Sequence, residues 1–596
     1  MKKKLLSLLT ASMLAAALFA GCGESGADTA EDATTSEETT QEAAVSEDKP
    51  AGSVTILYTN DTHGYLNNTT DQGLTFANIK AMKDDLEAEG QNVILVDAGD
   101  IIQGAAYASF DEGATAIELM NMAGYQVSTP GNHEFDYGSQ RFFSAMEEAD
   151  FPFVSCNFYD VQTGELVLEP YTVIEAGDVK VAFVGITTPE TLTKASPATF
   201  QDDITGEQLY SFYAGDDGQE LYDAVQSAID AASAEADYVI GLAHLGDNTD
   251  AEPYDSATVI EHITGLDAMI DSHSHTVNEC DYITDASGKE VLRTQTGSYL
   301  HNVGQMTIED GQVRTELISE YSNIDATIAE KIADTAEAMD VALGKDIAYL
   351  DCELYYNAPD TASRMVRSQE CNLGDLVADA YYYELTALYP FDVDAAIING
   401  GSLRTGLETG TISRIETLSE LPFTNNMTVI EATGQQLLDA LEMGACGIGE
   451  GESNGFLHVA GIHYTIDTSI ESTVQIDDAG AWTGAPTGDY RVKDVTIYDK
   501  ESGEYVPLDL EKTYRIGGTD YLLIYFGDGM SMFDGATVIA TQLTTDEQAL
   551  VSYVTAFAAG DDGLPHVNSA ASPLAELKGY GIEYENPYGA GRITIE

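Results

Sequence analysis

The chain has 596 residues, and its content of 44% hydrophobic and 9% aromatic residues is typical of globular protein. One hydrophobic core does not extend over such a length, so several domain-sized units are expected. Its 101 acidic against 25 basic residues leave a net charge of −76, which argues against nucleic-acid polymers and anionic membrane surfaces as partners, because both are bound through basic patches.

The first 22 residues have the anatomy of a bacterial secretory signal. Lysines precede an apolar run that is too short to cross a membrane comfortably, and small residues lead to Cys22. Residues 19–22, FAGC, resemble a lipobox, which implies cleavage before Cys22 and lipidation of this cysteine. An ordinary signal peptide cut nearby is the alternative.

Residues 23–52 contain no aromatic and almost no large aliphatic side chain, so we predict a disordered acidic tether. The protein is expected at the extracellular face of the bacterial cell membrane, held by lipid alone, or secreted. The five cysteines beyond Cys22 include no CxxC pair, and their odd number argues against a disulfide framework. No zinc knuckle is predicted either.

Residues 53–320 alternate strand-like apolar runs with helical segments. VTILYT, NVILV, VKVAFVGIT, YVIGLAH and LDAMI each end in, or run directly into, polar residues, and a helical pattern over 74–90 separates the first two. Strands that alternate with helices predict a layered α/β domain. In such folds, sites gather beyond the carboxyl ends of the strands.

A second unit is expected after this domain. Residues 321–346 carry a long amphipathic pattern and are predicted to form a linker helix, and residues 347–596 form a second α/β domain. The sequence shows no internal repeat.

Histidine is scarce, with ten in the chain, yet five lie at the ends of apparent strands or in the loops that follow them. Each has an ordinary structural explanation when taken alone; in GNHEFDYG, for example, Asn132 is compatible with the N-cap of a helix. Five polar clusters at the same edge of one sheet instead indicate a site. Its candidate residues are Asp61, His63, Asp100, Asn132, His133, Asp136, His244, His273 and His275.

The order of these motifs resembles a known family. NDTHG, AGDIIQG, GNHEFDYG, AHLGDN and DSHSH are similar to the motif set of the calcineurin-like metallophosphoesterases. More narrowly, residues 53–592 resemble the secreted bacterial 5′-nucleotidase/UDP-sugar hydrolase family. The resemblance implies an N-terminal layered α/β/β/α metallophosphoesterase domain, the linker helix, and a C-terminal 5′-nucleotidase domain that binds the nucleotide and rotates to carry it to the metals.

The resemblance also implies two divalent metal ions, which polarise a phosphoryl oxygen and generate hydroxide at neutral pH. Mixed nitrogen and oxygen ligands fit zinc, manganese, iron or cobalt and do not choose among them. Asp100 is assigned as the bridge, and some relatives carry glutamine at the position of His275. The first metal takes Asp61, His63, Asp100 and His275, and the second takes Asp100, Asn132, His244 and His273.

His133 is assigned a separate task, to stabilise the transferring phosphoryl group or to protonate the leaving oxygen. Asp136, three residues later, is expected on the same face of a helical turn, where it orients the imidazole. Glu134 is expected to be structural, or at most to support a ligand.

The second domain carries the substrate motifs VRSQECNLGDL, INGGSLR, LPFTNNM, SNGF and TDYLLIYFGDGMSMF. By resemblance, Arg367 and Arg404 contact the phosphate side, Asn425 the base or ribose, and Asp528 the ribose. Phe423 stacks on the base, and Gly455 allows close approach. Tyr521 is the expected second stacking ring, with Phe526 as the competitor. Arg364 precedes Arg367 by three residues, where relatives have four.

These observations predict an extracellular metal-dependent hydrolase that removes phosphate from nucleotides, with UDP-sugars as a further substrate class. A 2′,3′-cyclic-nucleotide phosphodiesterase/3′-nucleotidase, or a sulfur-ester hydrolase, on the same scaffold is the alternative. A non-catalytic nucleotide-binding surface protein is disfavoured, because a retired site need not keep all of these ligands. The sequence does not indicate the oligomeric state.

Overall fold

The computed structural model describes residues 52–66, 73–195, 197–202, 205, 207–215, 217–247, 253–361, 363–389, 391–449, 451–477 and 480–596. The predicted signal peptide, Cys22 and nearly all of the expected tether lie outside these residues. Within the described part of the chain, no helix combines the length and the apolar character needed to cross a bilayer.

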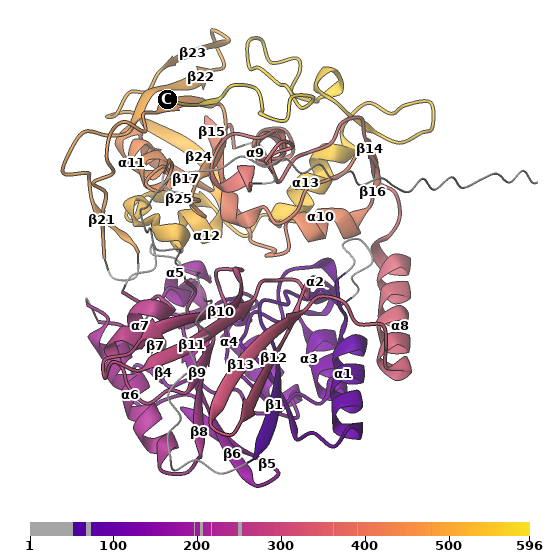
Figure 1. Cartoon of the computed structure of the whole chain (residues 1–596). Coiled ribbons are helices and arrows are strands. Elements are labelled where there is room, and N and C mark those ends of the chain that lie inside the picture. The colour runs from indigo at the N-terminus through magenta and orange to yellow at the C-terminus, as the bar shows by residue number, and fades with distance from the viewer. Residues whose placement is uncertain are drawn as a thin grey trace, which may run out of the picture. The chain divides into compact units, whose positions relative to one another are not determined.

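The first domain is built on two β-sheets (Figure 1). One sheet has the order β13 (Gln312–Ile318), β12 (Val303–Glu309), β1 (Ser53–Thr59), β2 (Val93–Asp97) and β3 (Val127–Ser128). The other has the order β10 (Val277–Thr284), β11 (Glu290–Thr296), β9 (Ala268–Ile270), β8 (Tyr238–His244), β6 (Val179–Thr187) and β5 (Tyr171–Ala176).

Apolar side chains of both sheets meet in one shared core, to which Ile56 and Ile94 contribute from one sheet and Phe183 and Ile240 from the other. Helices cover the two outer faces. α1 (Phe76–Ala88) and α3 (Ala114–Ala123) share a core with the first sheet, and α6 (Gln219–Ser233) and α7 (Ser256–His262) share one with the second. The expected α/β/β/α layering is therefore confirmed.

Strand register aligns the carboxyl ends of the central strands. β1 and β2 are parallel, with Thr59 opposite Asp97, and β6 and β8 are parallel, with Thr187 opposite His244. The loops that follow these strands therefore leave the two sheets at a common edge.

A long helix, α8 (Ala326–Leu343), connects the domains. The side chain of Asp325 caps its first turn by accepting hydrogen bonds from the backbone N–H groups of Thr327 and Ile328. Its buried residues, among them Ile328, Ile332 and Met339, follow a helical period. α8 contacts α1, α3 and α2 (Ala106–Asp111) of the first domain and α10 (Arg414–Glu420) of the second.

The second domain is a separate α/β unit. Its main sheet has the order β18 (Leu457–Ala460), β15 (Ala395–Asn399), β24 (Thr513–Thr519), β17 (Met427–Thr433) and β25 (Thr537–Ala540). A second sheet has the order β23 (Glu504–Pro507), β22 (Val492–Asp499), β19 (Ile462–Ile466) and β27 (Ile593–Ile595), and a small one joins β16 (Gly410–Ile412), β14 (Ala348–Leu350) and β26 (His566–Val567). The principal helices are α9 (Asn372–Tyr383), α11 (Gly434–Gly444), α12 (Asp520–Leu523) and α13 (Asp546–Thr555).

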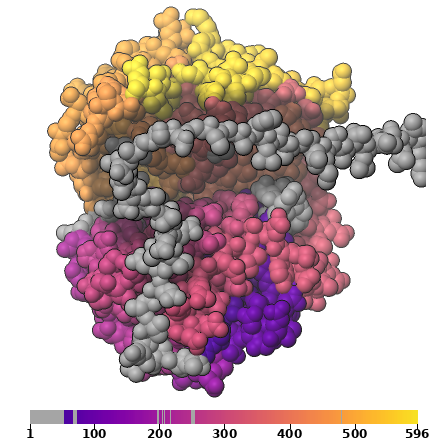
Figure 2. All heavy atoms as spheres, viewed as in Figure 1, coloured from indigo at the N-terminus to yellow at the C-terminus, as the bar shows by residue number. Residues whose placement is uncertain are grey.

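A buried ionic cluster fastens the end of the chain to this domain. Arg592, just before β27, donates a hydrogen bond of 2.9 Å to Asp379 of α9, and Tyr580 and Tyr584 donate to the same carboxylate at 2.9 and 2.7 Å. Arg592 is 1% exposed. Although Arg592 is buried, much of the segment after α13 lies on the outer surface of this domain, where Figure 2 shows its yellow atoms.

Candidate active site

The seven predicted metal ligands all follow, or end, strands of the first domain. Asp61 and His63 come after β1, Asp100 after β2 and Asn132 after β3, while His244 ends β8; His273 and His275 come after β9. The backbone around them is unusual, because Asp61, His63, Asp100, His273 and His275 all have positive φ. Such a conformation is strained for residues other than glycine, and its concentration here marks a functional site.

The structure brings these side chains together in two groups. The possible ligand atoms of Asp61, His63, Asp100 and His275 lie within 4.8 Å of one another, as do those of Asp100, His244 and His273. Asp100 belongs to both groups: its Oδ2 is 3.7 Å from Nε2 of His63 and 3.2 Å from Nε2 of His244. The arrangement fits a carboxylate between two cation sites.

An unpartnered donor atom supports the same interpretation. Oδ1 of Asn132 is buried without a hydrogen-bond partner among the described residues, and leaving such a group unsatisfied costs about 1–3 kcal/mol. Nε2 of His63 and Nε2 of His275 face each other at 3.0 Å. Burial holds the pKa of both imidazoles well below the usual range, which favours the neutral form that binds a cation. The residues therefore fit a divalent ion.

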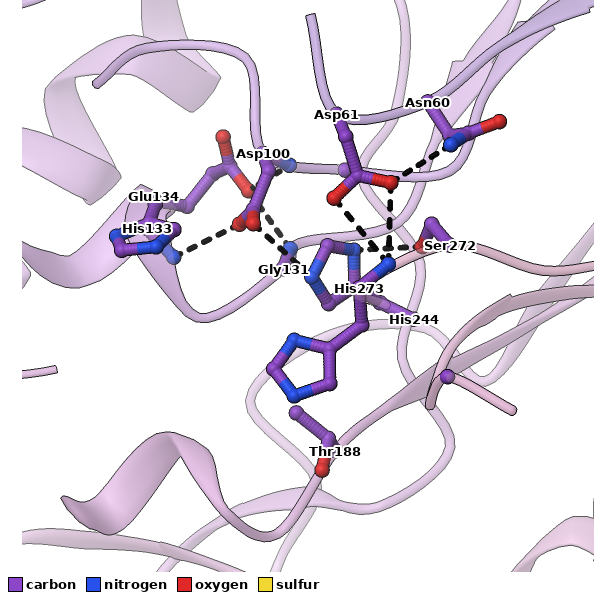
Figure 3. Close-up of polar contacts among 12 residues, drawn as sticks. Asn60, Asp61, Asp100, Gly131, His133, Glu134, Thr188, His244, Ser272 and His273 are labelled. Atoms are coloured by element: carbon purple, nitrogen blue, oxygen red, sulfur yellow. Dashed lines mark hydrogen bonds and ion pairs between the residues drawn. The ribbon is translucent and has the colours of Figure 1, made fainter. Parts of the chain in front are cut away.

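Hydrogen bonds fix how two of these rings are oriented. Nδ1 of His63 lies 3.0 Å from the carbonyl oxygen of Gln103, and Nδ1 of His244 lies 2.8 Å from that of Ala98. A histidine that donates through Nδ1 presents Nε2 as its ligand atom. Figure 3 shows His244 beside Ser272 in this arrangement.

His133 stands next to the ligands without joining either group. Its Nδ1 lies 2.5 Å from Oδ2 of Asp136, and its backbone N–H donates to Oδ1 of Asp100 at 2.9 Å. The expected helix start is wrong in detail: residues His133–Phe135 form a single 3-10 turn, and the Asn132 side chain makes no capping bond. The following helix, α4 (Ser139–Glu148), begins only at Ser139. The turn still places His133 and Asp136 on one face.

Glu134 supports the loop that carries Asp100. Its buried carboxylate accepts hydrogen bonds from the backbone N–H groups of Asp100, Ile101 and Gly131 at 2.8, 2.6 and 2.7 Å (Figure 3). Gly131 is equally constrained, because a Cβ there would lie 2.3 Å from Oδ1 of Asp100. The sequence left open whether Glu134 supports a ligand, and the structure shows this support.

One cavity of about 470 Å³ joins the ligand groups to the second domain. From the first domain it is lined by Asp100, Asn132, His133, Asp136, His273 and His275. All seven residues that the resemblance assigned to the substrate also line it: Arg367, Arg404, Phe423, Asn425, Gly455, Tyr521 and Asp528.

Three arginines, Arg364, Arg367 and Arg404, gather on the second-domain side of the cavity despite the acidity of the chain. Arg364 pairs with Glu452 at 2.7 Å, and the guanidinium of Arg404 lies 5.6 Å from the ring centroid of Phe423. Burial, with the neighbouring charges of Arg364 and Arg404, lowers the pKa of Arg367 to about 10. Nε of Arg367 has no hydrogen-bond partner among the described residues. Arginines gathered in this way are suited to an anion with several oxygens.

The second domain also offers the cavity an acid, Asp528, and an aromatic ring, Tyr521. Asp528 accepts a hydrogen bond from Nδ2 of Asn399 at 2.7 Å and lies 3.7 Å from Nζ of Lys194. Tyr521 lines the cavity, and its hydroxyl donates to the carbonyl oxygen of Thr193 at 2.9 Å. Phe526 is not among the lining residues, although it packs against the same hydrophobic core as Tyr521. Of the two candidate rings, Tyr521 is the one that faces the site.

Sequence reasoning missed several polar residues of this cavity, among them Glu190, Lys194 and Asn399. Glu190 and Lys194 belong to the segment TPETLTK, which follows β6 and contains α5 (Thr191–Lys194). Polar residues directly after a buried parallel strand were the available signal.

Comparison with known proteins bears on both domains. Residues 54–277 match the model of the calcineurin-like phosphoesterases, and residues 347–535 match that of the 5′-nucleotidase C-terminal domain. The chain belongs to the two-domain 5′-nucleotidase family. This family places it among phosphoric ester hydrolases, as expected from the motifs.

Individual relatives show how far the similarity extends. The chain is 27% identical over 526 residues to the trifunctional nucleotide phosphoesterase protein YfkN of Bacillus subtilis, covering 81% of this chain but 32% of that relative. It is also 27% identical over 537 residues to human 5′-nucleotidase, covering 81% and 84% of the two chains. The crystal structure of a 5′-nucleotidase precursor from Thermus thermophilus has the same fold, with a TM-score of 0.71 at 24% identity over 91% of this chain and 99% of that one.

Proposed function

We propose that the protein is a 5′-nucleotidase that hydrolyses the phosphate ester of nucleoside 5′-monophosphates and releases nucleoside and inorganic phosphate. One observation carries the proposal: a single cavity is lined by members of both His/Asp ligand groups (Asp100, His273 and His275) and by aromatic, arginine and carboxylate side chains suited to a nucleotide. Relatives named 5′-nucleotidase support it. UDP-sugars are a further proposed substrate class.

The cofactors we propose are two divalent ions, one in each ligand group, with Asp100 shared between them. Bound there, the ions would supply a Lewis acid for the phosphoryl oxygens and a lowered pKa for the attacking water. The donor set fits zinc, manganese, iron or cobalt. Asn132 completes the second group through its unpartnered Oδ1.

His133 is the proposed catalytic residue outside the ligand groups. With Nδ1 held by Asp136, its Nε2 remains to donate a proton or hydrogen bond to the phosphoryl group or to the departing ester oxygen. Because Asp136 fixes the ring orientation, the proton is delivered from one direction only.

The second domain would position the substrate. Arg367 and Arg404 bind the phosphate side, Asp528 accepts hydrogen bonds from the ribose hydroxyls, and Asn425 contacts base or ribose. Phe423 and Tyr521 provide two rings for the base, and stacking is worth about 1–3 kcal/mol per base. Both domains line the cavity, and we propose that the second domain rotates to carry substrate to the metals, with α8 as the hinge.

A phosphate-release panel tests the activity. The chain from Gly23 onward, loaded with Mn²⁺ or Zn²⁺, is expected to release phosphate from AMP and UMP and to lose this activity on chelation. His133→Ala should reduce kcat by about 100-fold or more with both metals still bound. Unchanged phosphate release in this variant would contradict the mechanism.

The same panel separates the main alternative. YfkN is named a trifunctional nucleotide phosphoesterase, so 2′,3′-cyclic AMP, with added phosphomonoesterase to free its phosphate, belongs beside AMP and UDP-glucose. A kcat/KM for the cyclic nucleotide that exceeds the value for AMP would favour the phosphodiesterase.

We also propose that the protein acts at the extracellular face of the membrane, anchored through lipid on Cys22. The support is the lipobox-like sequence FAGC. Labelled palmitate supplied to expressing cells should enter the parent protein but not Cys22→Ser, and detergent-phase partitioning should be lost together with the label. A parent protein without label would contradict the anchor.

A further inference from the structure

Glu190 lines the cavity, and its mostly buried carboxylate has no role in the proposed mechanism. Its Oε2 lies 3.2 Å from Nε2 of His273, and the two side chains are 22% and 16% exposed. We propose that Glu190 is a positioning residue for His273: it accepts the Nε2–H of the imidazole, so that Nδ1 is the nitrogen offered to a metal ion. This inference rests on the proposed metal site.

Hydrogen bonds hold the segment that carries Glu190 in place. Thr187 ends β6, and Asn157 bonds both its backbone N–H and its carbonyl oxygen, at 3.0 and 2.6 Å. The carbonyl oxygen of Thr188 accepts from the hydroxyl of Thr191 at 2.6 Å. Glu190 itself caps α5, because its carbonyl oxygen accepts from the N–H of Lys194 at 2.8 Å. A carboxylate on such a turn has a defined position relative to the end of β8.

His273 differs from His63 and His244 in the partner that contacts its ring. Its backbone N–H bonds to Asp61 at 3.1 and 3.2 Å, and its φ is 77°. Figure 3 shows its ring extending away from Asp61 toward Thr188. Backbone carbonyls orient the rings of His63 and His244, whereas the Glu190 carboxylate contacts the ring of His273. A carboxylate partner fixes the tautomer and raises the basicity of a ligating imidazole.

Lys194 gives Glu190 a charge partner on the opposite side. Although burial lowers it, attraction to Glu190 and Asp528 raises the pKa of Lys194 overall. Lys194 thus lies between the carboxylate that holds His273 and the acid assigned to the ribose. Glu190 contacts the proposed metal ligand His273, whereas Lys194 lies near Asp528. Loss of Lys194 should therefore weaken metal binding less than loss of Glu190.

Metal titration tests the assignment directly. Apo protein is titrated calorimetrically with Mn²⁺, and the visible spectrum is recorded with Co²⁺. For Glu190→Ala, the affinity of one of the two equivalents should fall about 10- to 100-fold, with altered Co²⁺ bands. Glu190→Gln keeps an oxygen acceptor and should recover most of this loss. The exposed Glu147→Gln on α4 is the matched control.

The outcomes distinguish this inference from the proposed function. A parent protein that takes up two equivalents, together with Glu190→Ala that binds both as tightly, would overturn the role of Glu190 alone. A parent that takes up no second equivalent would overturn the two-metal proposal and this inference with it. If Lys194→Met reproduced the loss seen in Glu190→Ala, Glu190 would act through Lys194 rather than through His273, and the assignment would be wrong.

Discussion

The proposed acid catalysis by His133 depends on one hydrogen bond, of 2.5 Å, between its Nδ1 and Oδ2 of Asp136. Asp136→Asn keeps the size of the side chain but removes the charge that favours an Nδ1–H donor. We expect kcat for AMP to fall about 10- to 100-fold with KM within about twofold, because substrate binding does not use this bond. Steady-state kinetics measure both, with the exposed Asp150→Asn as control. An unchanged kcat would show that the ring needs no orienting partner.

A second carboxylate gives a prediction about pH. Burial raises the pKa of Asp546, at the start of α13, to about 8. In the unfolded chain this group ionises near pH 4. Between these values only the unfolded chain loses the proton, so the group's contribution to stability falls by about 1.4 kcal/mol per pH unit as pH rises.

Asp546→Asn removes this dependence. The free energy of unfolding of the variant, relative to the parent, should therefore increase from pH 5 to about pH 8 and change little above it. Urea denaturation at a series of pH values measures the difference. A difference that stays constant over this range would mean that Asp546 is ionised in the folded protein.

For individual residues, the sequence was a better guide to which side chains belong to the site than to what each of them contacts. The ligand residues stood out because histidine is scarce and each group follows an apolar run. Glu134 had no visible task, because its partners are backbone N–H groups of a loop more than thirty positions earlier. Glu190 was missed for a similar reason, since its partner His273 lies 83 positions away. Such contacts depend on tertiary structure, which local patterns do not encode.

Among the secondary-structure elements, β27 and α9 are tied by the Arg592–Asp379 pair. Arg592→Met leaves the Asp379 carboxylate buried with only the two tyrosine hydroxyls for compensation. Breaking a buried pair from one side costs about 3–5 kcal/mol. We expect the free energy of unfolding of the second domain to fall by about this amount, and urea denaturation followed by tyrosine fluorescence measures the change.

The matched control is Arg314→Met on β13, whose guanidinium bonds to Gln312 at the surface. This change should alter stability by no more than about 0.5 kcal/mol. Equal effects of the two substitutions would show that the buried pair contributes nothing beyond an ordinary surface arginine.

Element types were predicted better than element ends. The helix expected over 74–90 is α1 (Phe76–Ala88), and the amphipathic pattern before residue 346 is α8. The turn after β3 was expected to open a helix, yet only three residues adopt a 3-10 conformation. In this turn, the hydrogen bonds made by His133, Glu134 and Asp136 decide the backbone conformation. Helix propensity is a weak guide where tertiary contacts of this kind are present.

The net negative charge of the whole molecule works against the binding of an anionic substrate. The net charge of −76 repels an anionic nucleotide at long range, while the cavity arginines attract it at short range. At 0.01 M salt the Debye length is about 30 Å, and at 0.15 M it is about 8 Å. Added salt should first raise kcat/KM for AMP, by screening the global field, and then lower it, by screening the arginines.

Initial rates from about 0.01 to 1 M KCl at low substrate concentration measure this profile. A monoanionic phosphodiester such as bis(4-nitrophenyl) phosphate should show a smaller rise than AMP, because it carries less charge. A kcat/KM for AMP that falls from the lowest salt onward would show that the arginines dominate at all distances.

The fold class and the family were predicted from motif order, and both are confirmed. The cavity itself was not predictable from periodicity. It depends on how residues after β2, β3, β6 and β9 come to lie near Arg367, Phe423 and Asp528, which are distant in the sequence. The family resemblance, and no local sequence pattern, linked the first-domain residues of the cavity with those of the second domain.

The division of the cavity between two domains separates bond breaking from recognition. Every ligand group belongs to residues before α8, whereas the residues proposed to recognise base and ribose come after it. A change of preferred nucleotide can therefore arise in the later half of the chain alone, with the hydrolytic apparatus left intact. Such an architecture lets one hydrolytic centre be inherited unchanged while its substrates diversify.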